Sequence, residues 1–268
     1  MPSPRRPVSK SNSPQPRTAK GAALFVAASL AALGIAAYRS ITMRWLSDDI
    51  YVTFRYIQQW FDGAGIVYNV GERVEGYTHF LWMLLLAGVR LIGVDVEVAS
   101  QWLGILSFLG TTLILALIAR QLHGGMRWTL PFAALALAFN YDSNVWATSG
   151  LETAFVTLLL TSAFFLYFFT SIAERTRLIG TGALLMLAAM TRPDMGLMYA
   201  IADASLVIAA ATNKTGWRSA LRTLLLFNAA FLIVYLPYLA WKLKYYGDIL
   251  PVTFYARVDS LIVLPWIF

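Results

Sequence analysis

Residues 178–211 read LIGTGALLMLAAMTRPDMGLMYAIADASLVIAAA, an apolar run that is interrupted near its middle by the polar tetrapeptide Thr191-Arg192-Pro193-Asp194. A helix of roughly 20 apolar residues crosses a bilayer, so this run is too long for one crossing. The proline and its charged neighbours favour a turn at the centre. We therefore expect a helical hairpin of two membrane spans joined by this tetrapeptide.

The rest of the chain has the composition of a helical membrane protein. Hydrophobic residues make up 59% of the 268 residues, charged residues make up 13%, and the mean hydropathy is +0.63. This composition excludes an ordinary soluble domain and predicts an all-α polytopic membrane protein. The chain contains no cysteine, which excludes disulfides and thiolate metal sites. Further apolar segments lie near 21–38, 79–94, 98–119, 128–141, 151–173 and 222–241.

The basic residues decide how these segments thread through the membrane. By the positive-inside rule, loops that carry Lys and Arg stay in the cytoplasm. One simple threading achieves this if residues 79–94, a short segment, lie on the outer side as an interfacial helix. We expect about seven transmembrane helices, with amphipathic juxtamembrane helices in a first outer loop at 40–97. The groups placed in the cytoplasm, besides the N-terminal tail, are Arg120 with Arg127, Arg175 with Arg177, and Lys214 with Arg218 and Arg222.

The N-terminal region differs from the remainder of the chain. Residues 1–20 are rich in Pro and Ser and contain no acid, which predicts a disordered basic cytoplasmic tail before a membrane domain at 21–268. The net charge of +7 arises from basic residues beside the ends of apolar segments, where they anchor a membrane protein. Membrane lipid is therefore an expected partner, and nucleic acid is not.

The acidic residues provide an independent test of this threading, because the threading is derived from the apolar segments and the basic residues alone. Glu174 falls on the cytoplasmic side, Asp203 falls within a span, and the other acids all fall on the outer face. A carboxylate near lipid is costly and is usually functional. This one-sided distribution indicates a reaction centre on the outer face.

The densest polar segment is residues 47–80, SDDIYVTFRYIQQWFDGAGIVYNVGERVEGYTHF. Its first part predicts an amphipathic helix on the outer interface, because four apolar residues recur at helical spacing. These residues are Ile50, Phe54, Ile57 and Phe61.

Asp48 and Asp49 stand at the start of this expected helix. One interpretation is structural, with Ser47 as the N-cap and the two acids in the first turn. The other is catalytic, because adjacent carboxylates near lipid repel each other and raise the pKa of one of them, which suits a general base.

Two other outer segments carry candidate binding residues. Glu75 and His79 flank Tyr77 at the start of the interfacial helix, a suitable place to bind a sugar or a phosphate. Glu152 follows a polar and aromatic stretch, which is typical of carbohydrate sites. The structural alternatives are an ordinary loop for the first segment and an interfacial aromatic belt with a helix-start Glu for the second.

Two further groups of residues could meet an anion. A charged Arg192 side chain at the hairpin tip costs free energy unless it pairs with an anion. That anion is either Asp194 or a lipid-linked phosphate. The last segment, 242–257, reads KLKYYGDILPVTFYAR and either binds phosphate and sugar or serves as a snorkelling anchor. Its candidate binding residues are Tyr246, Asp248 and Tyr255.

Several of these sequence segments together resemble the GT-C superfamily of membrane glycosyltransferases, which use polyprenyl-phosphate sugars. The resemblance is strongest to the branch that contains the cell-wall terminal arabinofuranosyltransferases. The matching pieces, in order from residue 48 to 256, are DDIYVTFRYIQQWFDGAGIVYN with GERVEGYTHFLW, then SGLETA, TRPD and YYGDILPVTFYA.

The resemblance implies an inverting transfer in which an Asp acts as the general base. The base falls on Asp49, with Asp48 as the second choice. The resemblance also implies that four other residues line the donor and acceptor site and that the Tyr-Tyr-Gly-Asp run lies near the lipid phosphate. The four lining residues are Glu75, Glu152, Arg192 and Asp194.

We therefore expect a glycosyltransferase of the bacterial inner membrane, with a cytoplasmic N-terminus and an active face on the periplasmic or extracellular side. It would move a sugar from a polyprenyl-phosphate donor to a cell-envelope glycan or lipid. No cofactor is implied beyond this lipid-linked substrate, and the clustered carboxylates permit a divalent metal without requiring one. Relatives are usually much longer, so we expect an N-terminal fragment or a truncated form. The alternatives are a lipid-sugar flippase or transporter, which needs polar residues at mid-bilayer, and a non-catalytic relative.

Overall fold

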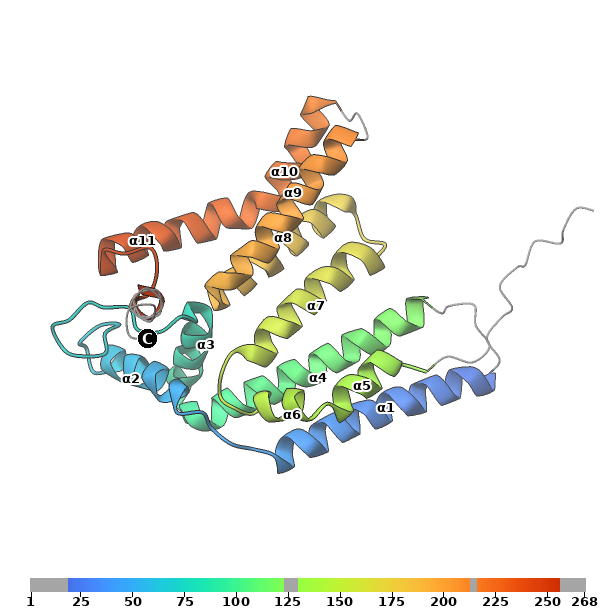
Figure 1. The fold of residues 1–268 in the computed structure, drawn as a ribbon, viewed down its shortest axis with the longest axis horizontal. Helices are drawn as coiled ribbons and strands as arrows, with labels where there is room; N and C mark the ends of the chain where they lie inside the picture. The colour runs from blue at the N-terminus through green and yellow to red at the C-terminus, as the bar shows by residue number, and fades with distance from the viewer. Residues whose placement is uncertain (1–18, 123–129, 213–215, 256–268) are drawn as a thin grey trace, which may run out of the picture.

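The computed structural model describes residues 19–122, 130–212 and 216–255, and these residues form helices and no strand (Figure 1). The predicted all-α class is confirmed. The first helices are α1 (Ala19–Thr42), α2 (Asp49–Phe61), α3 (Phe80–Leu91), α4 (Val96–Leu122), α5 (Phe132–Phe139) and α6 (Tyr141–Trp146). They are followed by α7 (Thr153–Phe169), α8 (Glu174–Thr191), η1 (Pro193–Met195), α9 (Gly196–Thr212), α10 (Trp217–Ala230), η2 (Phe231–Tyr235) and α11 (Leu236–Tyr246).

Within the described residues, four helical stretches are long and apolar enough to cross a membrane, which supports a membrane protein. They are Ala19–Thr42, Val96–Leu122, Pro193–Thr212 and Trp217–Tyr246. The helix α7 is shorter, and α8 carries charged residues in its first turn. The count of seven spans therefore stays a prediction.

Two expected boundaries differ from the structure. The expected span at 128–141 contains α5, a helix of eight residues that reaches only about 12 Å. It ends early because the Asn140 side chain accepts a hydrogen bond from the Ser143 backbone and starts α6. At the N-terminus, α1 already begins at Ala19, and the rest of the predicted tail lies outside the described residues.

The predicted hairpin is present between α8 and α9. Arg192 has an extended backbone, with φ −141° and ψ 121°, as the residue before a proline prefers. Pro193 then opens the short turn η1, from which α9 continues. The tetrapeptide thus places Arg192 and Asp194 at the tip of the hairpin, as expected.

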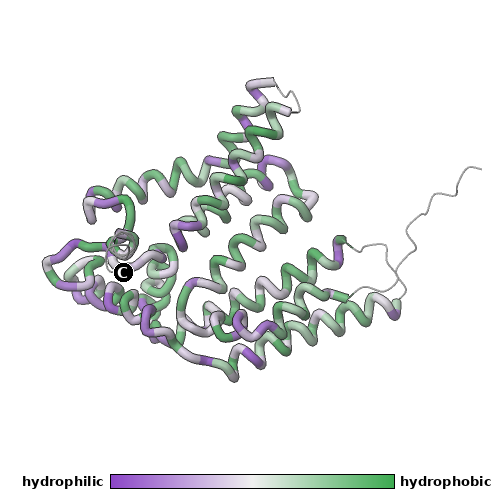
Figure 2. Tube along the Cα trace, viewed as in Figure 1, coloured by the Kyte–Doolittle hydropathy of each residue, from purple (hydrophilic) through white to green (hydrophobic). Residues whose placement is uncertain are grey.

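The loops that the threading assigned to the outer face lie together at one end of the helices, beside α2 and α3 on the left of Figure 1. Figure 2 shows hydrophilic residues gathered at this end. Hydrogen bonds join the loops to one another: Ser47 N–H donates to Ser149 O at 2.9 Å, and Val252 N–H donates to Glu75 O at 3.0 Å. The sidedness of this end in the membrane stays a prediction.

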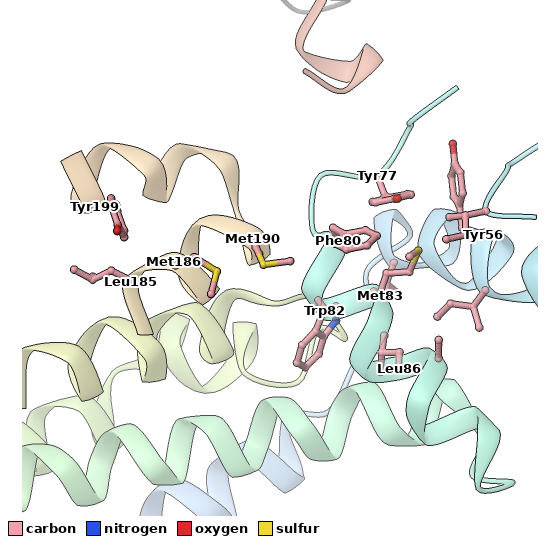
Figure 3. Close-up of a cluster of buried hydrophobic side chains, with 14 of the residues drawn as sticks. Tyr56, Tyr77, Phe80, Trp82, Met83, Leu86, Leu185, Met186, Met190 and Tyr199 are labelled. Atoms are coloured by element: carbon pink, nitrogen blue, oxygen red, sulfur yellow. The ribbon is translucent and has the colours of Figure 1, made fainter. Parts of the chain in front are cut away.

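The core between α2, α3 and their neighbours holds this end together (Figure 3). Ile50, Phe54 and Ile57 are buried, as the amphipathic pattern predicted, whereas Phe61 is exposed and packs against Arg90 at the edge. Trp82 of α3 is fully buried, and its indole N–H donates to Gly150 O at 2.9 Å. This bond ties α3 to the loop before α7.

Close helix contacts support the rest of the bundle. A Cβ added at Gly182 in α8 would lie 1.9 Å from the backbone oxygen of Phe227 in α10. Only glycine therefore allows these two helices to approach so closely, as small residues do in membrane bundles.

Candidate active site

A cavity of about 530 Å³, lined by both polar and apolar residues, lies among the loops at this end of the bundle. Its wall comes from five segments that are far apart in the sequence: the start of α2, the loop before α3, the loop before α7, the hairpin tip and the stretch after α11. Six of the predicted site residues line it. They are Asp49, Tyr77, His79, Glu152, Arg192 and Asp194.

The two adjacent acids of α2 have different positions. Asp48 is the N-cap, and its Oδ1 accepts the Asp49 backbone N–H at 3.0 Å. The predicted cap was Ser47, but Ser47 is buried and its backbone is bonded to Ser149, so the helix begins one residue later. Asp49 is exposed to the cavity, whereas Asp48 does not line it.

A chain of polar contacts runs from α2 through His79 to α7. The Nδ1 atom of His79 lies 3.2 Å from Glu152 Oε2, and Nε2 lies within hydrogen-bonding distance of the Thr53 hydroxyl. Because a carboxylate only accepts, Nδ1 carries the proton, and Nε2 then accepts from Thr53. Burial lowers the pKa of His79, although the Glu152 carboxylate opposes this shift. His79 is thus a neutral ring that is hydrogen-bonded to Thr53 and lies beside the Glu152 carboxylate.

Arg192 is held between two carboxylates. Its Nε and Nη2 atoms lie 3.1 and 3.2 Å from the two oxygens of Asp194, and Nη1 lies 3.7 Å from Glu152 Oε1. The hydrogen bonds to Asp194 raise the pKa of Arg192. Asp194 is therefore the partner of Arg192 in the structure, as one of the two interpretations predicted.

Glu75 lies behind the cavity wall instead of lining it. Its Oε2 atom is 2.7 Å from Lys242 Nζ, and both side chains are buried. Burial raises the pKa of Glu75, and the ion pair with Lys242 opposes that rise. This pair joins the first loop to α11, which the sequence did not indicate.

Tyr246 also supports the wall from behind. Its hydroxyl lies 3.1 Å from that of Tyr77 and donates to Ile66 O at 2.8 Å. Burial raises the pKa of Tyr77, so both hydroxyls stay neutral hydrogen-bonding groups. The pair fixes Tyr77 on the cavity side.

Asp248 and Tyr255 are exposed and do not line the cavity. Some of the residues between them do, since Leu250, Pro251 and Phe254 form one wall. The sequence missed these apolar residues and Thr53. Thr53 could have been found, since it lies one helical turn after Asp49 and so shares its face.

Among the residues that the structure describes, no group of three or more His, Asp or Glu side chains is arranged to hold a metal ion. A divalent metal stays a possibility drawn from the sequence.

Comparison with curated proteins gives two relatives that carry the same name, terminal β-(1→2)-arabinofuranosyltransferase. The protein from Mycobacterium tuberculosis is 31% identical over 227 residues, which cover 80% of this chain and 35% of the relative. The protein from Corynebacterium glutamicum is 25% identical over 240 residues, which cover 82% of this chain and 34% of the relative. The chain thus spans about a third of the length of the curated relatives it matches. No family model and no solved structure matches it.

Proposed function

We propose that this chain, a relative of the terminal arabinofuranosyltransferases, is a glycosyltransferase that moves a sugar from a polyprenyl-phosphate donor to a cell-envelope glycan or lipid. The observation that carries the proposal is the cavity, in which an exposed carboxylate, a buried His-Glu pair and an arginine meet from separate motifs. An acceptor hydroxyl, a sugar and a phosphate each need one of these groups.

Asp49 is the proposed general base. It removes the proton from the acceptor hydroxyl, whose oxygen attacks the anomeric carbon as the bond to the polyprenyl phosphate breaks. Attack from the face opposite the leaving group inverts the anomeric centre. Asp49 is preferred over Asp48 because Asp49 lines the cavity, whereas the Asp48 carboxylate caps α2.

Arg192 is the proposed contact for the donor phosphate. A guanidinium binds two phosphate oxygens at once and stabilises the negative charge that grows on a leaving phosphate. Arg192 is 40% exposed, so a ligand in the cavity can reach it.

The proposed location is the bacterial plasma membrane, with the cavity on the outer face. The support is the positive-inside rule, which assigns the basic loops to the cytoplasm. The cavity lies at the end of the bundle that carries α2 and α3, whose lengths and apolar faces suit the interface. A lipid-linked donor would meet the cavity there with its tail still in the bilayer.

The transporter alternative depends on Asp203, the acid within a span. Asp203 accepts a hydrogen bond from Asn228 Nδ2 at 2.8 Å, and Asn228 Oδ1 accepts one from Tyr199 at 2.9 Å. Asp203 is thus bonded to the neighbouring helix and does not line the cavity. This arrangement favours a structural role for Asp203 and an enzymatic role for the cavity.

The test is transfer by the purified protein in lipid nanodiscs, using a panel of radiolabelled polyprenyl-phosphate sugars and an envelope acceptor extract. Transfer from one donor, with an inverted anomeric configuration in the product, is the expected result. Donor binding without transfer from any donor would instead identify a non-catalytic relative. Movement of the lipid-linked sugar between leaflets without a new glycosidic bond would identify a transporter.

A further inference from the structure

The two carboxylates that hold Arg192 differ in burial and in geometry. The Glu152 side chain is 7% exposed and makes one long contact of 3.7 Å. The Asp194 side chain is 56% exposed and makes two contacts, at 3.1 and 3.2 Å, through Nε and Nη2. The well-formed contact is therefore the one that water and ligands can reach.

Asp194 is bound to Arg192 in the way that a phosphate would be bound. Two oxygens meet two parallel N–H groups, which is the arrangement that arginine forms with carboxylates and phosphates alike. An exposed ion pair of this kind contributes little stability, so its exchange for another anion is inexpensive. Once released, Asp194 would still lie in the first turn of the helix that continues through α9, where a negative charge is favoured.

Glu152 cannot leave Arg192 in the same way. Its other oxygen lies 3.2 Å from His79 Nδ1, and the far nitrogen of His79 is hydrogen-bonded to the Thr53 hydroxyl. All three side chains are buried. Glu152 therefore keeps Arg192 at the cavity wall when the Asp194 contact opens.

We propose that Asp194 is an internal counter-anion: it occupies the Arg192 guanidinium in the empty site and is displaced by the phosphate of the lipid-linked ligand. The inference rests on the proposed function for the identity of that ligand. The exchange itself needs only a phosphate group that enters the cavity.

The exchange would matter most for product release. A polyprenyl-phosphate sugar is a phosphodiester with one negative charge, whereas the released polyprenyl phosphate is a monoester with a charge near about −1.5 to −2. An arginine alone would hold the product more tightly than the substrate. Asp194 competes for the same guanidinium and so weakens the product complex, which allows the site to clear.

The experiment measures binding of two probes, inorganic phosphate and a short-chain polyprenyl phosphate, to the protein in nanodiscs. Asp194→Asn is expected to tighten binding about two- to fivefold, the range that corresponds to loss of an exposed ion pair. Asp62→Asn is the matched control, because it removes the same charge from an exposed residue at the end of α2 that does not line the cavity. Its effect should be smaller than about twofold.

The Arg192→Lys background tests whether the effect passes through the guanidinium. Lysine keeps the charge but loses the paired N–H groups, so Asp194→Asn should no longer tighten binding there. The proposal is supported if, in the protein that retains Arg192, Asp194→Asn tightens the binding of both probes or of the lipid probe alone. An effect on the lipid probe alone would show that the prenyl chain must hold the phosphate in place. The proposal is overturned if Asp194→Asn weakens binding, changes it no more than Asp62→Asn does, or tightens it equally in the Arg192→Lys background.

Binding of these probes is measured without sugar transfer, so the two proposals can fail separately. If the protein transfers no sugar but Asp194→Asn tightens binding, the counter-anion proposal stands and the enzyme proposal fails. If the protein transfers sugar but Asp194→Asn has no effect on binding, the enzyme proposal stands and the counter-anion proposal fails.

Discussion

The Lys242 ammonium lies 2.7 Å from the Glu75 carboxylate, and both side chains are buried between the first loop and α11. This ion pair joins the loop that carries Tyr77 and His79 to α11. The backbone of Glu75 also accepts the N–H of Val252, which belongs to the stretch that closes the cavity. The pair therefore connects two walls of the site without entering it.

Removal of one partner of this pair should destabilise the protein strongly. Glu75→Gln or Lys242→Met alone leaves a buried charge without its counter-ion, and we expect a loss of about 3–5 kcal/mol in the free energy of unfolding. The double replacement should recover much of that loss. Chemical unfolding in detergent micelles measures all three variants, and a double variant as unstable as the sum of the single ones would contradict a coupled pair.

Asp49 and Asp48 should respond differently to the same substitution. Asp49→Asn removes the proposed base and should lower kcat by about 10²–10⁴-fold. Asp48→Asn keeps a good N-cap, since Asn and Asp cap helices equally well, so stability and kcat should stay close to wild type. Single-turnover transfer assays on both variants decide this, and equal losses would show that the adjacent acids act as a unit.

His79 should make stability depend on pH in one direction. Burial lowers the folded-state pKa of His79 below its unfolded value of about 6.5, so the unfolded chain binds the proton first. The free energy of unfolding should therefore be fully retained above about pH 6.5 and should fall as the pH drops towards the lower folded-state pKa. The charged groups that face the ring are Glu152, Arg192 and Asp49.

The measurement is the difference in unfolding free energy between wild type and His79→Gln from about pH 8 to about pH 5, a range that brackets the ordinary histidine pKa. Other groups, such as Glu75, titrate in both proteins and cancel in the difference. A difference that stays constant over this range would contradict a neutral, buried His79.

Gly182 should tolerate no side chain. In Gly182→Ala the new Cβ meets the Phe227 backbone oxygen, so α8 and α10 must separate, and we expect a loss of about 1–3 kcal/mol or more. Gly34→Ala in α1 is the control, because nothing lies within 4 Å of its added Cβ and alanine favours a helix. Thermal unfolding of both variants tests this, and similar midpoints would argue against tight packing at Gly182.

Much of the fold could be predicted because hydropathy and helix-breaking residues act locally. The all-α class, the hairpin at residues 191–194 and the gathering of polar loops at one end all follow from the cost of placing charge in lipid. The lengths of the helices were less predictable. The α5 segment is apolar throughout, yet the Asn140 side chain ends it after two turns.

The sequence by itself determined which residues are candidates for the site, because in so apolar a chain each clustered acid, arginine or histidine needs a reason to be retained. Only the tertiary structure decided their arrangement. In the folded protein Asp49 lines the cavity whereas its neighbour Asp48 does not, and Glu75 lies behind the cavity wall in an ion pair with Lys242. The physical reason is that hydropathy depends on neighbours along the chain, whereas the partner of a buried charge is chosen by distant segments that meet only when the helices pack.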